Sequence, residues 1–166
     1  MLQTLIVDDE KRGRELLKMI LATNCPEVKV TGEASNIKEA YQMILQNEPD
    51  LVLLDIEMPG GTGFDLLSKF DEVNFDVIFI TAFDQYAIKA IKFSAMDYIL
   101  KPVDEEELIK AIKRAEENRN RKNNKEKVNT LISNVQKSSN HQKIGLTSGE
   151  GLEFIEIKNI LRCEAD

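Results

Sequence analysis

Three carboxylates, one hydroxyl and one ammonium each come directly after, or at the end of, a short apolar run in this chain. They belong to Asp8, Asp9, Asp55, Thr81 and Lys101. Carboxylate oxygens suit Mg²⁺, and a carboxylate can also attack a phosphoryl donor to form an aspartyl phosphate. We therefore expect a Mg²⁺-dependent phosphoacceptor site. Asp55 would be its nucleophile, Lys101 its cationic partner and Thr81 a hydroxyl donor.

The apolar runs predict how these residues come together. The runs are four or five residues long and rich in Val, Ile and Leu, which is typical of strands buried on both faces of a parallel sheet. The predicted strands cover residues 5–7, 28–31, 51–54, 77–80 and 98–100. Parallel strands end at one edge of the sheet, and ligands bind in the crevice there. The polar residues should therefore share one cleft.

Helical patterns alternate with these strands up to residue 118. Apolar residues recur at helix spacing in five segments: Leu16, Leu17, Ile20 and Leu21; Ile37, Ala40, Tyr41 and Ile44; Phe64, Leu67 and Phe70; residues 86–92; and Leu108, Ala111, Ile112 and Ala115. Asp104 is placed to cap the last of these helices. A turn is expected at residues 58–61. Strict alternation predicts an α/β fold with helices on both faces of the sheet.

Charge divides the chain near residue 118. Residues 1–118 carry 13 Lys/Arg and 23 Asp/Glu, whereas residues 119–143 carry 7 and 1. We expect one domain at 1–118 and a polar basic linker at 119–142. Apolar residues at helix spacing leave open a helical extension of that linker. Residues 143–166 begin with a hairpin pattern around Ser148–Gly151.

Composition limits the binding partners and the cellular location that we expect for the protein. The net charge of -7 argues against a chain that coats nucleic acid or anionic membrane along its whole length. We find neither a signal peptide nor a membrane-spanning run, and we expect Cys25 and Cys163 to be reduced thiols. A cytoplasmic location is expected. His141, the single histidine, lies in the polar linker and is expected to be solvated.

Each motif alone has an ordinary structural explanation. Asp8 and Asp9 could cap a helix, Lys101 before Pro102 could lie in a simple loop, and Thr81 could reflect strand propensity. Four such motifs, each at the carboxyl end of a strand, are harder to explain in this way because burying like charge is costly.

The same residues resemble the receiver domain of bacterial two-component response regulators. The resemblance covers residues 1 to about 118 and rests on VDDE at 7–10, LVLLDIEMPGGTGFDLL at 51–67, IFITAFDQYAIKAI at 78–91 and DYILKPV at 97–103. It implies a doubly wound, flavodoxin-like sheet with strand order 2-1-3-4-5. It also implies that a partner histidine kinase phosphorylates Asp55, and that the protein is a signalling switch able to lose its own phosphoryl group, rather than a metabolic enzyme.

The resemblance also assigns further roles within the site. It implies that Mg²⁺ is held by Asp9, Asp55 and the backbone carbonyl of Glu57, with Asp8 acting mainly through water. It implies that Thr81 and Tyr98 form the conformational switch. Phosphorylation is then expected to move the surface formed by residues 86–93, the strand at 98–100 and the helix after Asp104. We take this surface as the candidate contact of a phosphorylation-dependent homodimer.

Residues 143–166 resemble the first part of a LytTR-type DNA-binding domain. We therefore expect a truncated transcription regulator that contacts DNA only through the missing C-terminal domain. Two alternatives are weighed: a receiver that acts as a protein-interaction module without DNA output, and an aspartate-nucleophile phosphohydrolase. The latter needs two Asp separated by one residue, but that spacing gives Glu10 after Asp8 and Glu57 after Asp55.

Overall fold

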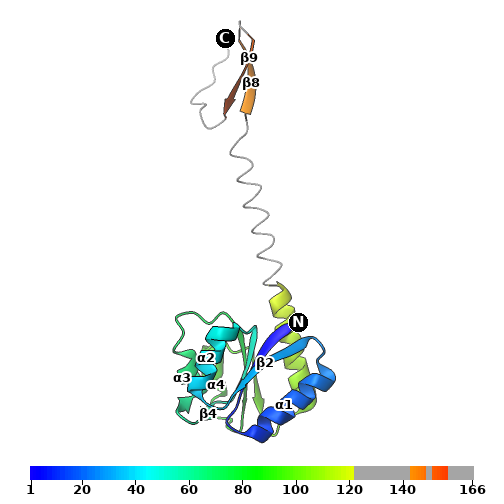
Figure 1. Cartoon of the computed structure of the whole chain (residues 1–166), viewed down its shortest axis with the longest axis vertical. Coiled ribbons are helices and arrows are strands. Elements are labelled where there is room, and N and C mark those ends of the chain that lie inside the picture. Colours follow the sequence, from blue (N-terminus) through cyan, green and yellow to red (C-terminus); the bar gives the residue numbers. More distant parts are fainter. Residues whose placement is uncertain (122–142, 149–150, 157–166) are drawn as a thin grey trace. The chain divides into compact units, whose positions relative to one another are not determined.

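The computed structural model describes residues 1–121, and the backbone of residues 143–148 and 151–156 (Figure 1). It contains two compact units, Met1–Arg119 and Asn120–Asp166, which are described separately. Within the described ranges, no helix has both the length and the apolar character needed to cross a bilayer.

The first unit is built on a five-stranded parallel sheet with the order β2-β1-β3-β6-β7. Its strands are β1 (Leu2–Val7), β2 (Val28–Ala34), β3 (Leu51–Leu54), β6 (Asp76–Thr81) and β7 (Asp97–Leu100). Each predicted strand lies within one of these, and the order confirms the flavodoxin-like arrangement. All four residues of β3 are buried, as a central parallel strand requires.

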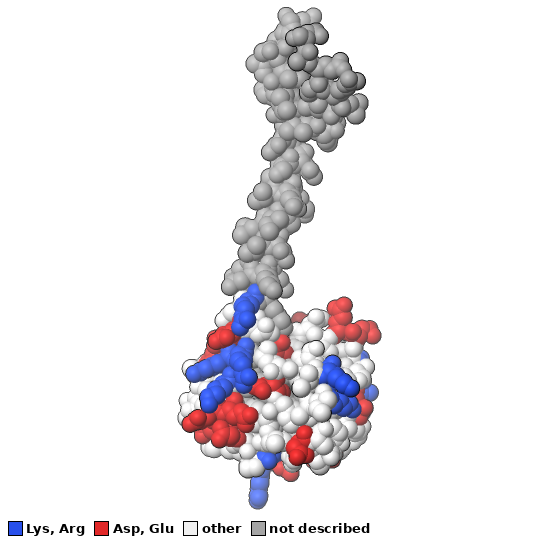
Figure 2. Space-filling view, turned by 180° about the vertical axis from the view of Figure 1, so that it is seen from behind, with Lys and Arg blue, Asp and Glu red and all other residues white. Residues whose placement is uncertain are grey.

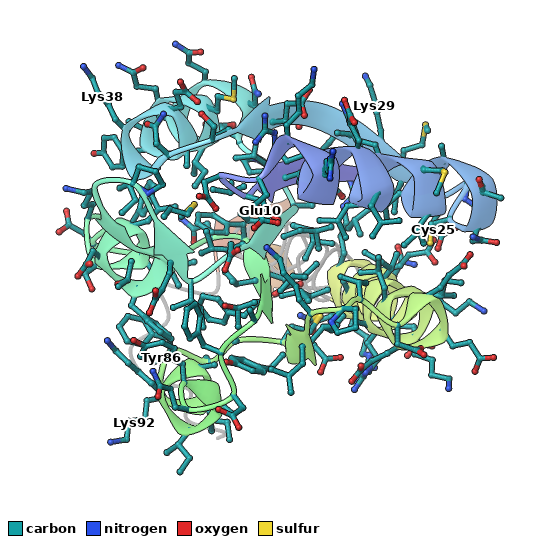
Figure 3. The ribbon with its side chains drawn as sticks, turned by 90° about the horizontal axis from the view of Figure 1, so that it is seen from below. Glu10, Cys25, Lys29, Lys38, Tyr86 and Lys92 are labelled. Atoms are coloured by element: carbon teal, nitrogen blue, oxygen red, sulfur yellow. The ribbon has the colours of Figure 1, made fainter. Side chains whose placement is uncertain are left out.

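Helices cover both faces of the sheet. They are α1 (Lys11–Asn24), α2 (Ile37–Asn47), α3 (Gly63–Leu67), α4 (Ala87–Lys92) and a helix over residues 105–121. Side chains of α2, α3 and α4 share one apolar core with Val52 and Leu54. Side chains of α1 and of the helix at 105–121 share the other core with Leu51 and Leu53. Alternate residues of one strand therefore supply the two cores, which makes three layers (Figure 3).

Side-chain caps define where several helices begin. Asn36 accepts a hydrogen bond from the Glu39 amide at 3.0 Å at the start of α2. Asp104 accepts one from the Glu107 amide at 2.9 Å, which confirms the predicted cap of the last helix. These caps satisfy amide groups that have no partner inside the helix.

The predicted helix with Leu16, Leu17, Ile20 and Leu21 is present as α1, although Leu16 is 40% exposed because α1 turns Leu17 toward the sheet. One local expectation was wrong. Helix α3 ends at Leu67, so Phe70 lies beyond it. The turn expected at residues 58–61 is present, with two-residue strands β4 (Glu57–Met58) and β5 (Gly61–Thr62) on either side of Pro59 and Gly60.

The second unit contains an antiparallel hairpin of β8 (Lys143–Ser148) and β9 (Gly151–Glu156), with Ser148 opposite Gly151. This confirms the hairpin prediction. The linker at 122–142, its helical alternative, His141 and Cys163 lie outside the described residues. The assignment of residues 1–118, 119–142 and 143–166 to a receiver, a linker and the start of a LytTR-type domain stays a prediction. Cys25 is a buried free thiol, and burial raises its pKa.

Candidate functional site

The polar residues singled out in the sequence lie at the carboxyl edge of the sheet. Backbone hydrogen bonds extend the strand pairing beyond the strand ends and fix the main chain there. The Asp8 amide donates to Ala34 at 3.1 Å, and the Asp55 amide donates to Val7 at 2.8 Å. Figure 3 looks onto this edge, where the labelled Glu10 lies between the two helical layers. The strand ends therefore direct these residues into one place.

Three carboxylates meet in this place. Asp8, Asp9 and Asp55 each offer one oxygen, and these oxygens all lie within 4.8 Å of one another. Asp8 is 2% exposed and Asp55 is 6% exposed, whereas Asp9 lies open to solvent. A cluster of hard oxygen donors that is buried on one side and open on the other fits Mg²⁺, which keeps part of its water shell. The donor set therefore suits the ion that the sequence led us to expect.

Lys101 supplies the positive charge of the cluster. Its Nζ lies 2.6 Å from Asp55 Oδ2 and 2.9 Å from Asp8 Oδ2. Burial works against a charged ammonium, but hydrogen bonds to Asp55 and Asp8 outweigh it, so the pKa of Lys101 is raised. Lys101 is therefore a cation at neutral pH. The Lys101–Pro102 peptide is cis.

Asp55 is held firmly in this arrangement. Its Oδ1 accepts a hydrogen bond from the Ile56 amide at 2.6 Å, while its Oδ2 faces Lys101. Gly63, the first residue of α3, packs against its backbone: a Cβ there would lie 2.7 Å from the Asp55 carbonyl oxygen. The backbone around Asp55 and the start of α3 thus come closer than most side chains would allow.

Comparison with known proteins identifies the family. Residues 4–113 match the family described as the response regulator receiver domain. The chain belongs to this family. Over 165 residues the receiver and its C-terminal extension are 33% identical to sensory transduction protein LytT of Bacillus subtilis, covering 97% of this chain and 64% of that protein. Over 161 residues they are 35% identical to transcriptional regulatory protein BtsR of Salmonella typhi, covering 93% of this chain and 65% of that protein.

The solved structures give the same result. The receiver domain of AraT, a response regulator from Geobacillus stearothermophilus, superposes with a TM-score of 0.65 at 30% identity, covering 73% of this chain and 98% of that one. The chain spans between about half and two thirds of the length of the curated relatives it matches, for example 47% of LytT of Bacillus cereus and 65% of BtsR. These relatives are signalling and regulatory proteins by name. The chain therefore contains the receiver of a two-component response regulator.

Thr81 and Tyr98, the two residues expected to form the switch, lie on the neighbouring strands β6 and β7, and their role as a switch stays a prediction. Thr81 ends β6 and is fully buried, and within the described part of the chain its Oγ1 has no hydrogen-bond partner. Its carbonyl accepts from the Lys101 amide at 2.8 Å, so the two residues are tied through the backbone. Tyr98 is not drawn into the carboxylate cluster: its hydroxyl donates to the Phe83 carbonyl. Burial raises the pKa of Tyr98.

Glu57, the remaining expected metal ligand, begins β4. Its carboxylate accepts a hydrogen bond from the Tyr86 hydroxyl at 3.3 Å, which connects the loop after Asp55 to the start of α4. An aromatic cluster centred on the buried Phe64 lies beside this connection, because the Phe64 ring also contacts that of Tyr86. The ring of Phe64 lies 4.9 Å from that of Phe79 and 5.1 Å from that of Phe93, measured between centroids. The sequence contained these aromatics, but nothing in their spacing indicated that they meet.

Arg14 was also missed. It lies on the first turns of α1 and donates to the carbonyl oxygens of Asp8 and Asp9, at 2.6 and 3.2 Å. An arginine within six residues of an acidic pair at a strand end only weakly indicates such backbone contacts, because most arginines are solvated.

Proposed function

We propose that Asp55 accepts a phosphoryl group from a sensor histidine kinase in a Mg²⁺-dependent reaction, and that this phosphorylation controls a DNA-binding output. One observation carries the proposal: the ammonium of Lys101 lies within ion-pair distance of two buried carboxylates at the carboxyl edge of the sheet. Such a group stabilises a resting carboxylate and can later contact a transferred phosphoryl oxygen.

The transfer is a displacement at phosphorus. An Asp55 carboxylate oxygen forms a bond to phosphorus, while the P–N bond of the donor phosphohistidine breaks and its electron pair stays on the imidazole. The Ile56 amide and Lys101 orient the two carboxylate oxygens before attack. Attack of water on phosphorus later breaks the bond to Asp55, releases phosphate and restores the carboxylate, which is autodephosphorylation.

Mg²⁺, when bound, would neutralise charge on the transferring oxygens. Its ligands in this proposal are Asp9, Asp55 and the backbone carbonyl of Glu57, with Asp8 acting through water. The close approach of the Asp8, Asp9 and Asp55 oxygens supports this assignment. Thr81 then donates its hydroxyl to a phosphoryl oxygen, and Tyr98 turns toward the space that Thr81 leaves.

The output proposed is DNA binding through a LytTR-type C-terminal domain, of which residues 143–166 are the first part. The similarity to LytT and BtsR, which extends over more than 90% of this chain, supports this proposal. A cytoplasmic location follows from the same assignment, because the kinase's phosphohistidine and the DNA are both there.

A short reaction with a small phosphodonor tests the central step. With Mg²⁺ and acetyl phosphate, intact mass spectrometry should find one added phosphoryl group on the wild-type chain and none on Asp55→Asn. Omitting Mg²⁺ and adding EDTA should abolish labelling. Equal labelling of both proteins would refute the assignment of Asp55. Continuous release of phosphate from p-nitrophenyl phosphate would instead indicate a phosphohydrolase.

We also propose that phosphorylation promotes a homodimer through the surface of α4, β7 and the helix after Asp104. This surface carries exposed apolar side chains, including Ile88 at 73% and Ile91 at 75% exposure. Figure 2 views the first unit from this side and shows uncharged surface between groups of Lys/Arg and Asp/Glu. Burying such side chains against a second copy would stabilise a dimer.

Sedimentation velocity with and without beryllofluoride tests the dimer. Ile88→Lys should abolish the shift to a larger species that wild type shows. Leu45→Lys, at an exposed apolar position of α2, is the matched control and should retain it. Equal loss in both variants would argue against this surface.

A further inference from the structure

Arg14 connects three separate elements beside the carboxylate cluster. It lies on α1, and its Nη1 donates to the backbone carbonyls of Asp8 and Asp9. Its Nε donates to Glu33 Oε2 at 3.2 Å, on the edge strand β2. Lys18, one turn further along α1, donates to the other Glu33 oxygen at 3.0 Å. The guanidinium thus bridges the turn that carries two acidic residues and the neighbouring strand.

These contacts distinguish Arg14 from an ordinary helix-surface arginine. Its side chain is only 14% exposed, although most arginines reach into solvent. A guanidinium has several donors in a fixed plane, so it can hold two carbonyls and a carboxylate at once. A backbone held at two successive carbonyls has little freedom to rotate, and this fixes the directions in which both side chains leave it.

The turn itself depends on this backbone geometry. Asp8 Oδ1 accepts a hydrogen bond from the Glu10 amide at 2.8 Å, so one carboxylate oxygen is used within the turn. Its other oxygen faces Lys101 at 2.9 Å. Asp9, by contrast, is exposed, and its side chain has no hydrogen bond or ion pair within the described part of the chain. The carbonyl of Asp9 is held by Arg14, so Arg14 limits where the Asp9 carboxylate can go.

We propose that Arg14, held by Glu33, is a positioning residue for the magnesium site: it keeps the Asp8–Asp9 turn in the conformation that gathers its carboxylates beside Asp55. The inference rests on the proposed function only in naming Mg²⁺ as the ion. Residues that orient metal ligands from outside typically change metal affinity by about 10–100-fold when removed. We expect Arg14→Ala to weaken Mg²⁺ binding by about 10-fold.

The sign of this effect separates positioning from simple electrostatics. Arg14 is a cation close to an acidic site, so its charge alone repels Mg²⁺. If charge were the only influence, Arg14→Ala would tighten Mg²⁺ binding. Lys11→Ala removes the same charge from the same helix at a position that is 80% exposed and that, among the described residues, pairs only with Glu15. This control should leave Mg²⁺ affinity unchanged or raise it slightly.

Isothermal calorimetry of Mg²⁺ binding to the full chain is the decisive measurement, with circular dichroism as the check on folding. Arg14→Ala should bind about 10-fold more weakly than wild type. Arg14→Lys keeps the charge but loses the planar guanidinium, so its Mg²⁺ affinity should lie between those of wild type and Arg14→Ala. Glu33→Gln keeps an acceptor for Nε and should weaken binding by less than Arg14→Ala does.

The outcomes separate this inference from the proposed function. If wild type and Arg14→Ala bind Mg²⁺ equally, or if Arg14→Ala binds more tightly, the positioning role is refuted while the phosphoacceptor site stands. If Lys11→Ala weakens binding as much as Arg14→Ala, the effect is not specific to Arg14 and the positioning role is refuted. If wild type binds no Mg²⁺, the proposed function and this inference fall together. Should Arg14→Ala be unfolded, Arg14→Lys and Glu33→Gln decide, and wild-type affinity in both would refute the role.

Discussion

The Lys101 ammonium lies 2.6 Å from the Asp55 carboxylate although the two residues are 46 positions apart in the chain. Asp55 follows the central strand β3, whereas Lys101 follows the edge strand β7, and β6 lies between them. A lysine that spans this distance over the end of β6 also reaches Asp8. The cation is therefore shared by carboxylates that follow two different strands, so Lys101 offsets the negative charge of both Asp8 and Asp55.

Replacing Lys101 with Ala should leave two buried carboxylates without their cation. We expect a loss of about 1.5–3 kcal/mol in the free energy of unfolding, because hydrogen bonds to charged groups contribute in that range. Mg²⁺ should restore part of it by supplying positive charge. Urea unfolding with and without Mg²⁺ measures both effects. Lys69→Ala, at an exposed lysine, is the control, and equal stability of the two variants would contradict this account.

The ion pairs of Glu33 predict a small acid sensitivity. The hydrogen bond from Lys18, followed by that from Arg14, lowers the pKa of Glu33 below its ordinary value of 4.5. A lowered folded-state pKa means that the contribution is present above pH 4.5 and is lost as pH falls through the folded-state value. Glu33 is largely exposed, so screening limits the contribution to about 0.2–1 kcal/mol. The stability difference between wild type and Glu33→Gln should therefore be constant near neutral pH and shrink in acid. A difference that grew in acid would contradict this sign.

Much of this site could be predicted because its residues stand at strand ends. Strands that alternate with helices form a parallel sheet, and all strands of such a sheet end at the same edge. The meeting of Asp8, Asp55 and Lys101 therefore follows from topology alone. Arg14 could not be predicted in the same way, because its contact with Glu33 depends on how α1 packs beside β2. That packing is decided by which of Leu16 and Leu17 faces the sheet, and both fit the helical pattern.

The small elements were also hard to predict, for a related reason. Two-residue strands such as β4 and β5 are too short to show any period in the sequence. The contacts of Phe64 with Phe79 and Phe93 join α3, β6 and the end of α4. Such contacts depend on the angle and separation of packed elements. Residue spacing along the chain does not specify either of these quantities.

Gly63→Ala should be destabilising although it lies in a helix. Helix propensity alone predicts a gain of up to about 1 kcal/mol. The added Cβ would instead lie 2.7 Å from the Asp55 carbonyl oxygen and 3.0 Å from Leu54 Cγ, and the backbone must move to relieve this. We expect a loss of about 1–3 kcal/mol, typical of overpacking, together with slower phosphorylation by acetyl phosphate. Thermal unfolding shows whether Gly63→Ala gains or loses stability. A stabilised variant would show that the backbone moves at little cost to relieve the contact.

Thr81→Val should separate stability from switching. The Thr81 hydroxyl is fully buried and has no partner within the described residues, so replacing it with a methyl group removes an unsatisfied polar atom. We expect a gain of about 1 kcal/mol in the free energy of unfolding. The same variant lacks the donor that we assign to the phosphoryl oxygen. Beryllofluoride should then change hydrogen exchange in residues 86–93 and 97–100 of wild type but much less in the variant. An identical exchange response in both proteins would remove Thr81 from the switch.

Residues 1–166 should not bind DNA selectively. Residues 1–118 carry 23 Asp/Glu against 13 Lys/Arg, and this excess repels phosphate at long range. Specific DNA interfaces bury on the order of 1,000 Å² of protein surface or more, which exceeds what the hairpin of β8 and β9 can offer. Weak binding through the basic residues of 119–127 should disappear as salt rises, since it depends on release of counterions.

A chain extended through a complete LytTR-type domain should instead bind one sequence in a salt-tolerant manner, more tightly after phosphorylation. Gel shifts of both chains test this prediction. Selective binding by residues 1–166 would contradict the proposal that DNA is bound only through the C-terminal domain. No binding by the extended chain would favour a receiver whose output is another protein.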